Sequence, residues 1–294
     1  MSPSSFGTLP QVMLYFCPLN VDEMNLEQVE QIRQWLSEDE LAKVSRYIQP
    51  QARDKGLMVR GYLRGILSLH TGTAGKIAPQ DWRFVYGEKG KPDLIAKQRV
   101  HTGLKFNISH SGDWLVIAVL DAKQTSMADT YNDDIELGVD IERSRANTNI
   151  YSILNHYFTQ TESDELLTLP EHLQRERFFD LWALKESYIK AKGLGLSLSL
   201  KSFSFDFSQM IENRCLLEAH GSDIKVLPLF NNITLNIHDE HRGKNADDSR
   251  WSVYLAKLNE EYRFALSISN VGKVDLNTLE LTVQEMLARL DCDS

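Results

Sequence analysis

The sequence predicts an α+β protein, because helical and strand-like hydrophobic periodicities both occur along it, each in segments of its own. Apolar residues within 178–192 recur every three or four positions, as on one face of an amphipathic helix. Residues 137–142 instead alternate apolar and polar side chains, as a strand with one buried face does. Residues 104–120 have the pattern of two strands joined by a short polar turn.

The composition is that of a globular protein, with 294 residues that are 42% hydrophobic and 25% charged. A formal net charge of −9 and a pI near 5.4 argue against a broad surface for nucleic acid or anionic membrane. Apolar runs are too short to span a bilayer, and we find no N-terminal secretion signal. Three widely separated cysteines form neither a metal nor a redox pair, so we expect a reducing cytoplasm.

The first part of the chain alternates helices and strands. Ser37 and Glu40 form a capping-box pattern that opens a helix. A later helix, 52–70, carries an apolar stripe together with several basic residues. In order, we expect a strand at 12–17, helices at 26–35, 41–48 and 52–70, a strand at 82–86, a loop at 87–92, and strands at 104–109 and 114–120.

A polar stretch without periodicity, 122–134, is expected to be a surface loop, and we place the boundary between two halves of the chain near Glu136. The second half has a strand first and helices next, as the first half does. Gly193 is placed to end the helix that starts near residue 171. We expect helical pieces in 151–169, a helix at 171–192, strands at 202–207, 224–229, 233–237, 251–258 and 262–269, and a closing helix at 281–290.

Trp182, Glu186 and Lys190 are four residues apart, so a helix places them along one line. A carboxylate then lies one turn from an aromatic ring and one turn from an ammonium group. The ordinary interpretation is an exposed ion pair, worth about 0.2–0.5 kcal/mol.

The strand at 137–142 favours a functional interpretation. Asp140 and Glu142 are two residues apart and therefore point to the same side of the strand. Two neighbouring carboxylates repel each other, a cost that a divalent cation can reverse. If Glu186 faces them, three oxygen ligands converge and leave positions of an octahedral Mg²⁺ shell for phosphate and water.

Three blocks, G-V-D-I-E at 138–142, F-N-I-S-H-S at 106–111 and W-A-L-K-E-S-Y-I-K-A-K-G-L-G-L at 182–196, together resemble the signature blocks of the 4′-phosphopantetheinyl transferases, and among these the longer, Sfp-like group. The resemblance implies two similar α+β halves with the active site in the cleft between them. Residues 1–136 would form the N-terminal half, with the coenzyme A-binding loop and the N-I-S-H-S strand. Residues 137–294 would form the C-terminal half, with the G-V-D-I-E strand and the W-A-L-K-E-S helix. It also implies a monomer.

The implied reaction moves the 4′-phosphopantetheine arm of coenzyme A to a serine of an apo acyl- or peptidyl-carrier protein, with release of adenosine 3′,5′-bisphosphate. Asp140, Glu142 and Glu186 would hold Mg²⁺. Glu186 is a candidate base as well as a ligand, and both roles stay open. Lys190 would offset charge on the leaving group.

The resemblance also assigns residues to coenzyme A. A basic residue of the 52–70 helix would reach the 3′-phosphate, with Lys55 the best match and Arg53 a close alternative. Lys91 and Pro92 belong to a G-K-P turn like the family's nucleotide-binding loop. The expected hairpin puts Ser109 and His110 of the N-I-S-H-S strand at its exposed end, and the resemblance implies that His110 contacts phosphate.

Two other classes of protein remain possible from the residues alone. A Mg²⁺-dependent phosphodiesterase or nuclease would also gather carboxylates and a lysine, although the acidic net charge offers no polyanion track. A carrier-binding module without catalysis would be expected to lack one of the three carboxylates. The carrier served, whether of fatty-acid, polyketide or nonribosomal-peptide synthesis, is not encoded in these patterns.

Overall fold

The computed structural model of the chain describes residues 9–20, 24–71, 75–124, 134–219, 223–238 and 250–292. The expected loop at 122–134 lies mostly outside these ranges. The first half contains β1 (Gln11–Pro18), α1 (Leu26–Trp35), α2 (Glu38–Ser45), α3 (Pro50–Leu69), β2 (Phe84–Tyr86), β3 (Pro92–Leu94), α4 (Ala96–Thr102), β4 (Leu104–Ser111) and β5 (Trp114–Asp121).

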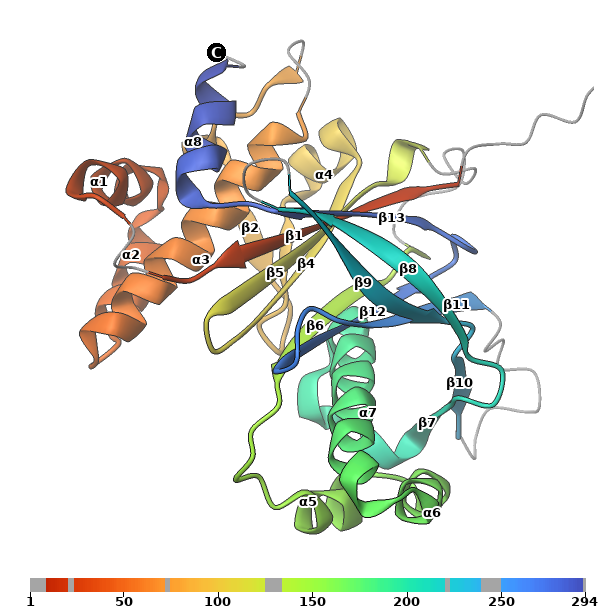
Figure 1. The fold of residues 1–294 in the computed structure, drawn as a ribbon. Helices are drawn as coiled ribbons and strands as arrows, with labels where there is room; N and C mark the ends of the chain where they lie inside the picture. The colour runs from red at the N-terminus through yellow and green to blue at the C-terminus, as the bar shows by residue number, and fades with distance from the viewer. Residues whose placement is uncertain are drawn as a thin grey trace, which may run out of the picture.

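The second half repeats the combination of helices and strands (Figure 1). It contains β6 (Leu137–Arg143), α5 (Ile150–Tyr157), α6 (Gln160–Thr168), α7 (Glu171–Lys192), β7 (Phe203–Asp206), β8 (Ile211–Glu218), β9 (Ile224–Asn231), β10 (Thr234–Ile237), β11 (Trp251–Lys257), β12 (Tyr262–Ser269), β13 (Asp275–Glu280) and α8 (Val283–Cys292). The mixed α+β class and the two similar halves are confirmed.

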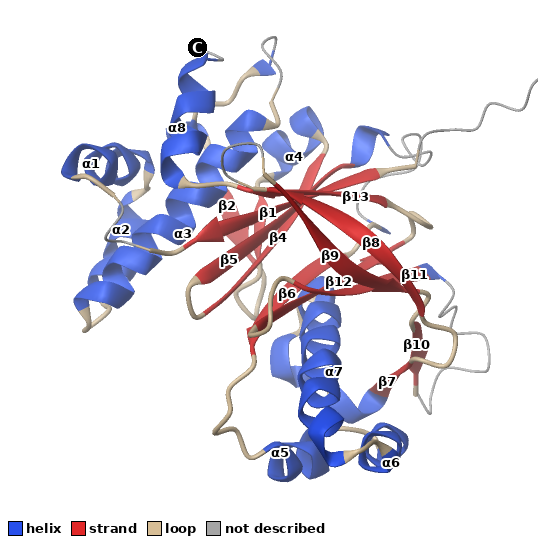
Figure 2. Ribbon diagram, in the orientation of Figure 1, coloured by secondary structure: helices blue, strands red, loops and turns tan. Residues whose placement is uncertain are grey.

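One nine-stranded sheet joins the halves, in the order β4-β5-β1-β13-β8-β9-β11-β12-β6. The sheet curls so that its two end strands, β4 and β6, lie side by side (Figures 1 and 2). Side chains of β4 bond to β6 across this line, which we call the seam. The curled sheet thus protects its two edges, which would otherwise expose unpaired backbone groups.

Helices cover the outside of the curled sheet (Figure 2). Helices α3 and α8 share a buried core with β1 and β5. In the second half, α7 packs on β11 and β12. A third core fills the inside of the curl, where Phe16 of β1 and Phe264 of β12 meet with ring centroids 4.8 Å apart. All three cores contain side chains of the sheet, so the sheet holds α7 and β4 in place on the two sides of the seam.

Local signals located most elements correctly. The predicted Ser37 capping box opens α2, and the structure shows another at Thr159, where α6 begins. Strands β3, β8 and β13 and helix α4 are additional to the expected set. The last strand pairs with β1, and α8 contributes Met286 to the core of the first half. The division at Glu136 stays a prediction.

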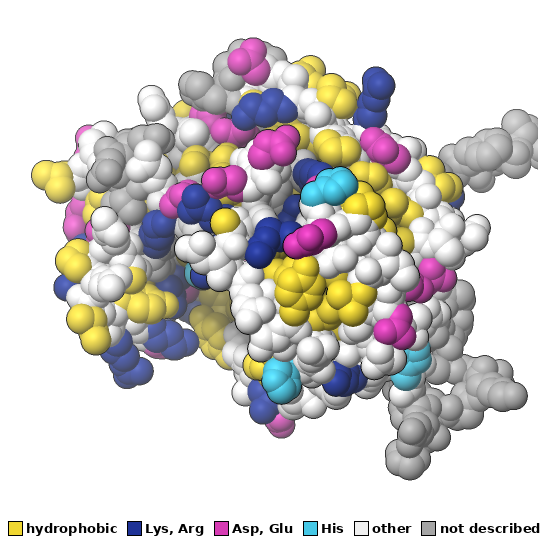
Figure 3. All heavy atoms as spheres, turned by 60° about the horizontal axis from the view of Figure 1, so that its bottom comes forward, with side chains coloured by type: hydrophobic (Ala, Val, Ile, Leu, Met, Phe, Trp, Pro, Cys, Tyr) yellow, Lys and Arg dark blue, Asp and Glu magenta, His cyan; other side chains and the backbone are white. Residues whose placement is uncertain are grey.

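Within the described ranges, none of the helices is both long enough and apolar enough to span a membrane. On the face drawn in Figure 3, basic and acidic side chains are intermixed among the coloured residues rather than gathered into one field. Any polyanion binding on this face therefore depends on a local cluster of cations.

Candidate active site at the seam

Helix α7 is buried along most of its second half. From Phe178 to Lys190, only Trp182, Glu186 and Lys190 are partly exposed. The helix ends at Gly193, which adopts a left-handed conformation with φ +67°. The predicted line of three side chains is therefore the only stripe of this segment that reaches a cavity or solvent.

Gly138 brings α7 directly against β6. A Cβ at this position would lie 2.1 Å from the carbonyl oxygen of Ser187 and 2.3 Å from the backbone nitrogen of Ala191. No side chain fits between strand and helix here, so the backbones touch. The hydroxyls of Ser187 and Ser267, 2.7 Å apart, tie the helix to β12 as well.

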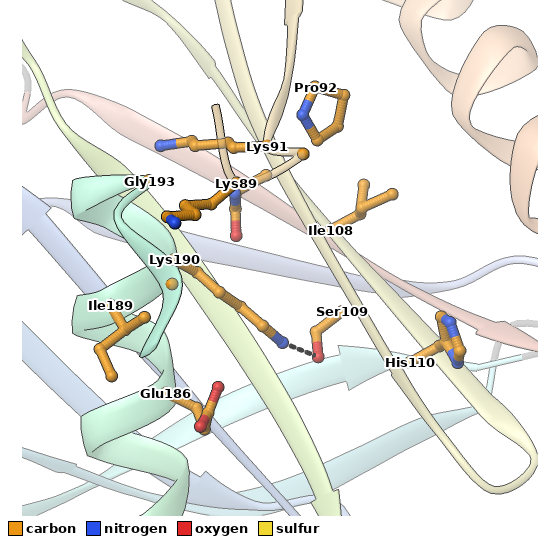
Figure 4. A pocket seen from close by; sticks show the side chains of 13 residues that line it. Lys89, Lys91, Pro92, Ile108, Ser109, His110, Glu186, Ile189, Lys190 and Gly193 are labelled. Carbon is orange, nitrogen blue, oxygen red and sulfur yellow. Dashed lines mark hydrogen bonds between the residues drawn. The ribbon is translucent and has the colours of Figure 1, made fainter. Parts of the chain in front are cut away.

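Asp140 lies two residues beyond Gly138 and faces α7, as strand alternation requires. Its Oδ1 accepts hydrogen bonds from Lys190 Nζ and from Ser109 Oγ, the latter at 2.8 Å. Lys190 Nζ also donates to Ser109 Oγ (Figure 4). Lys190 thus pairs with Asp140 of β6 rather than with Glu186, and the three side chains join α7, β6 and β4.

The second oxygen of Asp140 is buried without a hydrogen-bond partner. Burial and the neighbouring charge of Asp140 raise the pKa of Glu142 to about 7. The same two causes raise the pKa of Glu186. The anionic forms of Glu142 and Glu186 are therefore destabilised by their removal from water and by the charge of Asp140.

These residues suit a divalent cation in their chemistry. The acidic oxygens, one of them buried and unpaired, are the donors that Mg²⁺ prefers. The described part of the chain contains no group of three or more His, Cys, Asp or Glu close enough to hold a metal. The ammonium of Lys190 is instead the cation beside Asp140.

Across the seam, His110 lies in a basic environment. Although the His110 side chain is exposed at the surface, the protein packed around its imidazole partly removes it from water, and this lowers its pKa together with the positive charges of Lys190, Lys55 and Arg60. Lys55 Nζ donates to the carbonyl oxygen of Gly112 at 2.8 Å and to Asp113 at 3.0 Å, both in the turn that follows β4. A cluster of cations around an uncharged imidazole is suited to bind a phosphate.

Lys55 and Arg53, the two candidates in α3 for binding the 3′-phosphate, lie in different places. Lys55 reaches the β4–β5 turn, close to His110. Arg53 donates to the carbonyl oxygen of Ile48 and lines another cavity, between α2 and α3. Arg60 also belongs to this basic group, although its spacing in the sequence does not distinguish it from the other basic residues of the helix.

A cavity of about 430 Å³ opens between the loop before β3, strand β4 and the end of α7 (Figure 4). Its walls include most of the candidate residues, namely Lys91, Pro92, Ser109, His110, Glu186 and Lys190. Lys55, Asp140 and Glu142 are not among the residues that line it. The cavity thus adjoins both the acidic and the basic groups.

Ser109 and His110 were expected together at an exposed hairpin end, which is wrong for Ser109. Strand β4 continues to Ser111, and Ser109 is 4% exposed whereas His110 is exposed. Asn107, Ser109 and Ser111 all point at β6, because they alternate along the strand. The backbone N–H groups of Val139 and Arg143 donate to Asn107 and Ser111 at 2.9 and 3.2 Å. The N-x-S-x-S alternation was the signal for this role.

The chain is also similar in sequence to known proteins. A model of the 4′-phosphopantetheinyl transferase superfamily matches residues 136–266, and a model of the 4′-phosphopantetheinyl transferase N-terminal region matches residues 24–121. The 4′-phosphopantetheinyl transferase HetI of Nostoc sp. is 31% identical over 62% of this chain and 69% of its own length. The 4′-phosphopantetheinyl transferase Sfp of Bacillus subtilis is 30% identical over 63% of this chain and 73% of its own length.

A mammalian relative is similar over a comparable stretch. The L-aminoadipate-semialdehyde dehydrogenase-phosphopantetheinyl transferase of Mus musculus is 30% identical over 62% of this chain and 63% of its own length. The two family models together cover both sides of the seam. The chain therefore belongs to the 4′-phosphopantetheinyl transferases, the enzymes that move the phosphopantetheine arm of coenzyme A to carrier proteins.

Proposed function

We propose that the seam is the reaction centre, with Asp140, Glu142 and Glu186 as the ligands of Mg²⁺ and the adjoining cavity as the coenzyme A site. The observation that carries this proposal is the buried, unpartnered Oδ2 of Asp140 beside two carboxylates of raised pKa. A buried oxygen without a partner is costly unless a ligand completes it.

The basic side of the seam would hold the coenzyme. Lys55 and His110 are proposed to bind its phosphates, with Lys55 on the 3′-phosphate and Arg60 as a further cation. Ser109 is proposed to lie beside the coenzyme, in the wall that it shares with His110. Pro92 and the backbone and stem of Lys91 would form the wall beside the nucleotide.

The proposed reaction is an in-line substitution at phosphorus. The carrier serine oxygen forms a bond to the phosphorus that bears the pantetheine arm, and the bond from this phosphorus to the bridging pyrophosphate oxygen breaks. The electron pair leaves with adenosine 3′,5′-bisphosphate. When bound, Mg²⁺ supplies charge neutralisation of the pyrophosphate.

Glu186 is proposed to accept the proton of the attacking serine. Its raised pKa lies closer to neutrality than that of an ordinary carboxyl group, which favours proton transfer near pH 7. Lys190 would approach the leaving oxygens once the coenzyme phosphates compete with Asp140 for its ammonium. Both residues come from the partly exposed stripe of α7, one turn apart.

Membership of the Sfp-like group, a monomeric state, a cytoplasmic location and the division into residues 1–136 and 137–294 are part of the same proposal. Support for the division comes from the two family models, which match separate stretches on either side of residue 136. A nuclease is disfavoured by the acidic net charge of −9.

The test is direct. The purified protein is incubated with coenzyme A, Mg²⁺ and several apo carrier domains of different synthases, and each carrier is weighed by intact-mass spectrometry. We expect conversion of at least one carrier to its holo form, and we expect a chelator to stop it. Unmodified carriers together with no binding of coenzyme A would refute the proposal, and hydrolysis of a plain phosphodiester would favour the nuclease alternative.

A further inference from the structure

Lys91 reaches from the loop of the first half into the second half. Its Nζ donates to the carbonyl oxygen of Ala191 at 2.8 Å and to that of Leu137 at 3.1 Å. Ala191 belongs to the last turn of α7, and Leu137 begins β6. One ammonium group therefore connects the G-K-P loop, the helix that carries Glu186 and the strand that carries Asp140.

The two acceptors explain why a cation fits at this place. The last four carbonyl groups of a helix lack intrahelical partners and carry the negative end of its dipole. The stem of Lys91 also packs on the end of the helix, because a Cβ on Gly193 would lie 3.2 Å from Lys91 Cδ. Glycine at this position thus admits both the left-handed turn and the lysine.

We propose that Lys91 is a positioning residue, whose ammonium clamps the start of β6 to the end of α7 and so fixes Asp140 relative to Glu186. The inference rests on the proposed function for the identity of the reactive groups. It also assigns the ammonium a role other than binding a phosphate of the coenzyme.

The direction of the side chain supports this assignment. In Figure 4 the side chain of Lys91 extends across the end of α7, away from Ser109 and His110. Two of its three N–H donors have acceptors in the protein already. Lys91 is partly buried, and this burial lowers the pKa of its ammonium group to about 8. Lys89, two residues earlier in the same loop, is exposed and serves as the matched comparison.

The experiment compares Lys91→Met, Lys91→Arg and Lys89→Met with the parent. Hydrogen exchange of residues 137–142 and 188–193 is measured without ligands, followed by the Kd of coenzyme A by calorimetry and by kcat and KM with a carrier. Loss of the clamp should speed exchange in both segments of Lys91→Met and lower kcat about 10- to 100-fold, since small misplacements of reacting groups are costly. The Kd of coenzyme A should stay within about threefold of the parent.

The controls separate a clamp from a charge effect. Lys89→Met removes a positive charge from the same loop and should leave exchange of both segments at the parent rate. Lys91→Arg keeps a donor and should restore slow exchange in part. If Lys91→Met does not fold, Lys91→Gln, which replaces the ammonium by an uncharged amide, takes its place in the same measurements.

A large loss of coenzyme A affinity in Lys91→Met, with parent kcat and parent exchange, would overturn the proposal in favour of a phosphate contact. Unchanged exchange, kcat and affinity would overturn it as well. Because the exchange measurement needs neither coenzyme nor carrier, it decides the clamp even if no carrier is modified and the proposed function itself fails.

Discussion

The Cα of Gly138 on β6 faces the backbone of Ser187 on α7 so closely that a methyl group at this position would lie 2.1 Å from the Ser187 carbonyl oxygen. This contact sets the distance between the strand that carries Asp140 and the helix that carries Glu186 and Lys190. The atoms that a Cβ would meet, the Ser187 carbonyl oxygen and the Ala191 nitrogen, belong to the backbone and cannot move aside as a flexible side chain can.

Gly138→Ala should therefore push α7 away from β6. Overpacking commonly costs about 1–3 kcal/mol, and we expect a loss of about 3 kcal/mol or more in the free energy of unfolding because backbone atoms are involved. Urea denaturation measures this loss. Gly87→Ala is the control, since a Cβ there would meet a single neighbour, the Lys91 carbonyl oxygen at 3.8 Å. Parent stability of Gly138→Ala would show that the helix can shift freely.

The raised pKa of Glu142 should make the stability of the fold depend on pH. Its pKa is raised from 4.5 to about 7 in the folded state, so the folded protein holds a proton that the unfolded chain releases. The stability it contributes is fully present below about pH 4.5 and is lost as the pH rises through 7. Relative to Glu142→Gln, the parent should therefore lose several degrees of thermal midpoint between pH 5 and pH 8.

Addition of Mg²⁺ at pH 8 should raise the thermal midpoint of the parent more than that of Glu142→Gln, because an ion relieves the repulsion among the carboxylates. Differential scanning calorimetry at both pH values provides the measurement. A midpoint difference that stays constant from pH 5 to pH 8 would mean that Glu142 is not destabilised by its neighbours.

Substitution of Lys55 and substitution of Arg53 should affect the recognition of coenzyme A differently. A charge-assisted hydrogen bond to phosphate contributes about 1.5–3 kcal/mol, so Lys55→Ala should raise the KM for coenzyme A roughly 10- to 100-fold. It should have little effect on the KM for 3′-dephospho-coenzyme A. Arg53→Ala should leave the parent preference intact, because Arg53 lines the separate cavity between α2 and α3. If Lys55→Ala still prefers coenzyme A to 3′-dephospho-coenzyme A as strongly as the parent does, Lys55 does not bind the 3′-phosphate, and Arg60 or Arg53 becomes the candidate.

Periodicity in the sequence accounts for much of this site. The four-residue spacing of Trp182, Glu186 and Lys190 identifies the partly exposed stripe of α7, and the alternation of Asp140 and Glu142 places both on one side of β6. These are local properties, since helix and strand geometry fix which side chains share a face.

Contacts between elements far apart in the sequence could not be predicted in the same way. The pairing of Lys190 with Asp140 and the reach of Lys91 to Ala191 join residues 50 and 100 positions apart. The return of β13 to β1 depends on the whole sheet. Such contacts follow from the packing of complete elements, for which a single sequence carries no periodic signal.

The most direct test of the account is the turnover of Glu186→Gln at saturating Mg²⁺, coenzyme A and carrier. The substitution keeps the size of the side chain and removes its charge. We expect a loss of about 10²- to 10⁴-fold in turnover if proton transfer is the main role of Glu186. The thermal midpoint should stay near that of the parent or rise, because repulsion with Asp140 is relieved. Full turnover in Glu186→Gln would contradict the assignment of α7 as the catalytic helix and, with it, the three-carboxylate site.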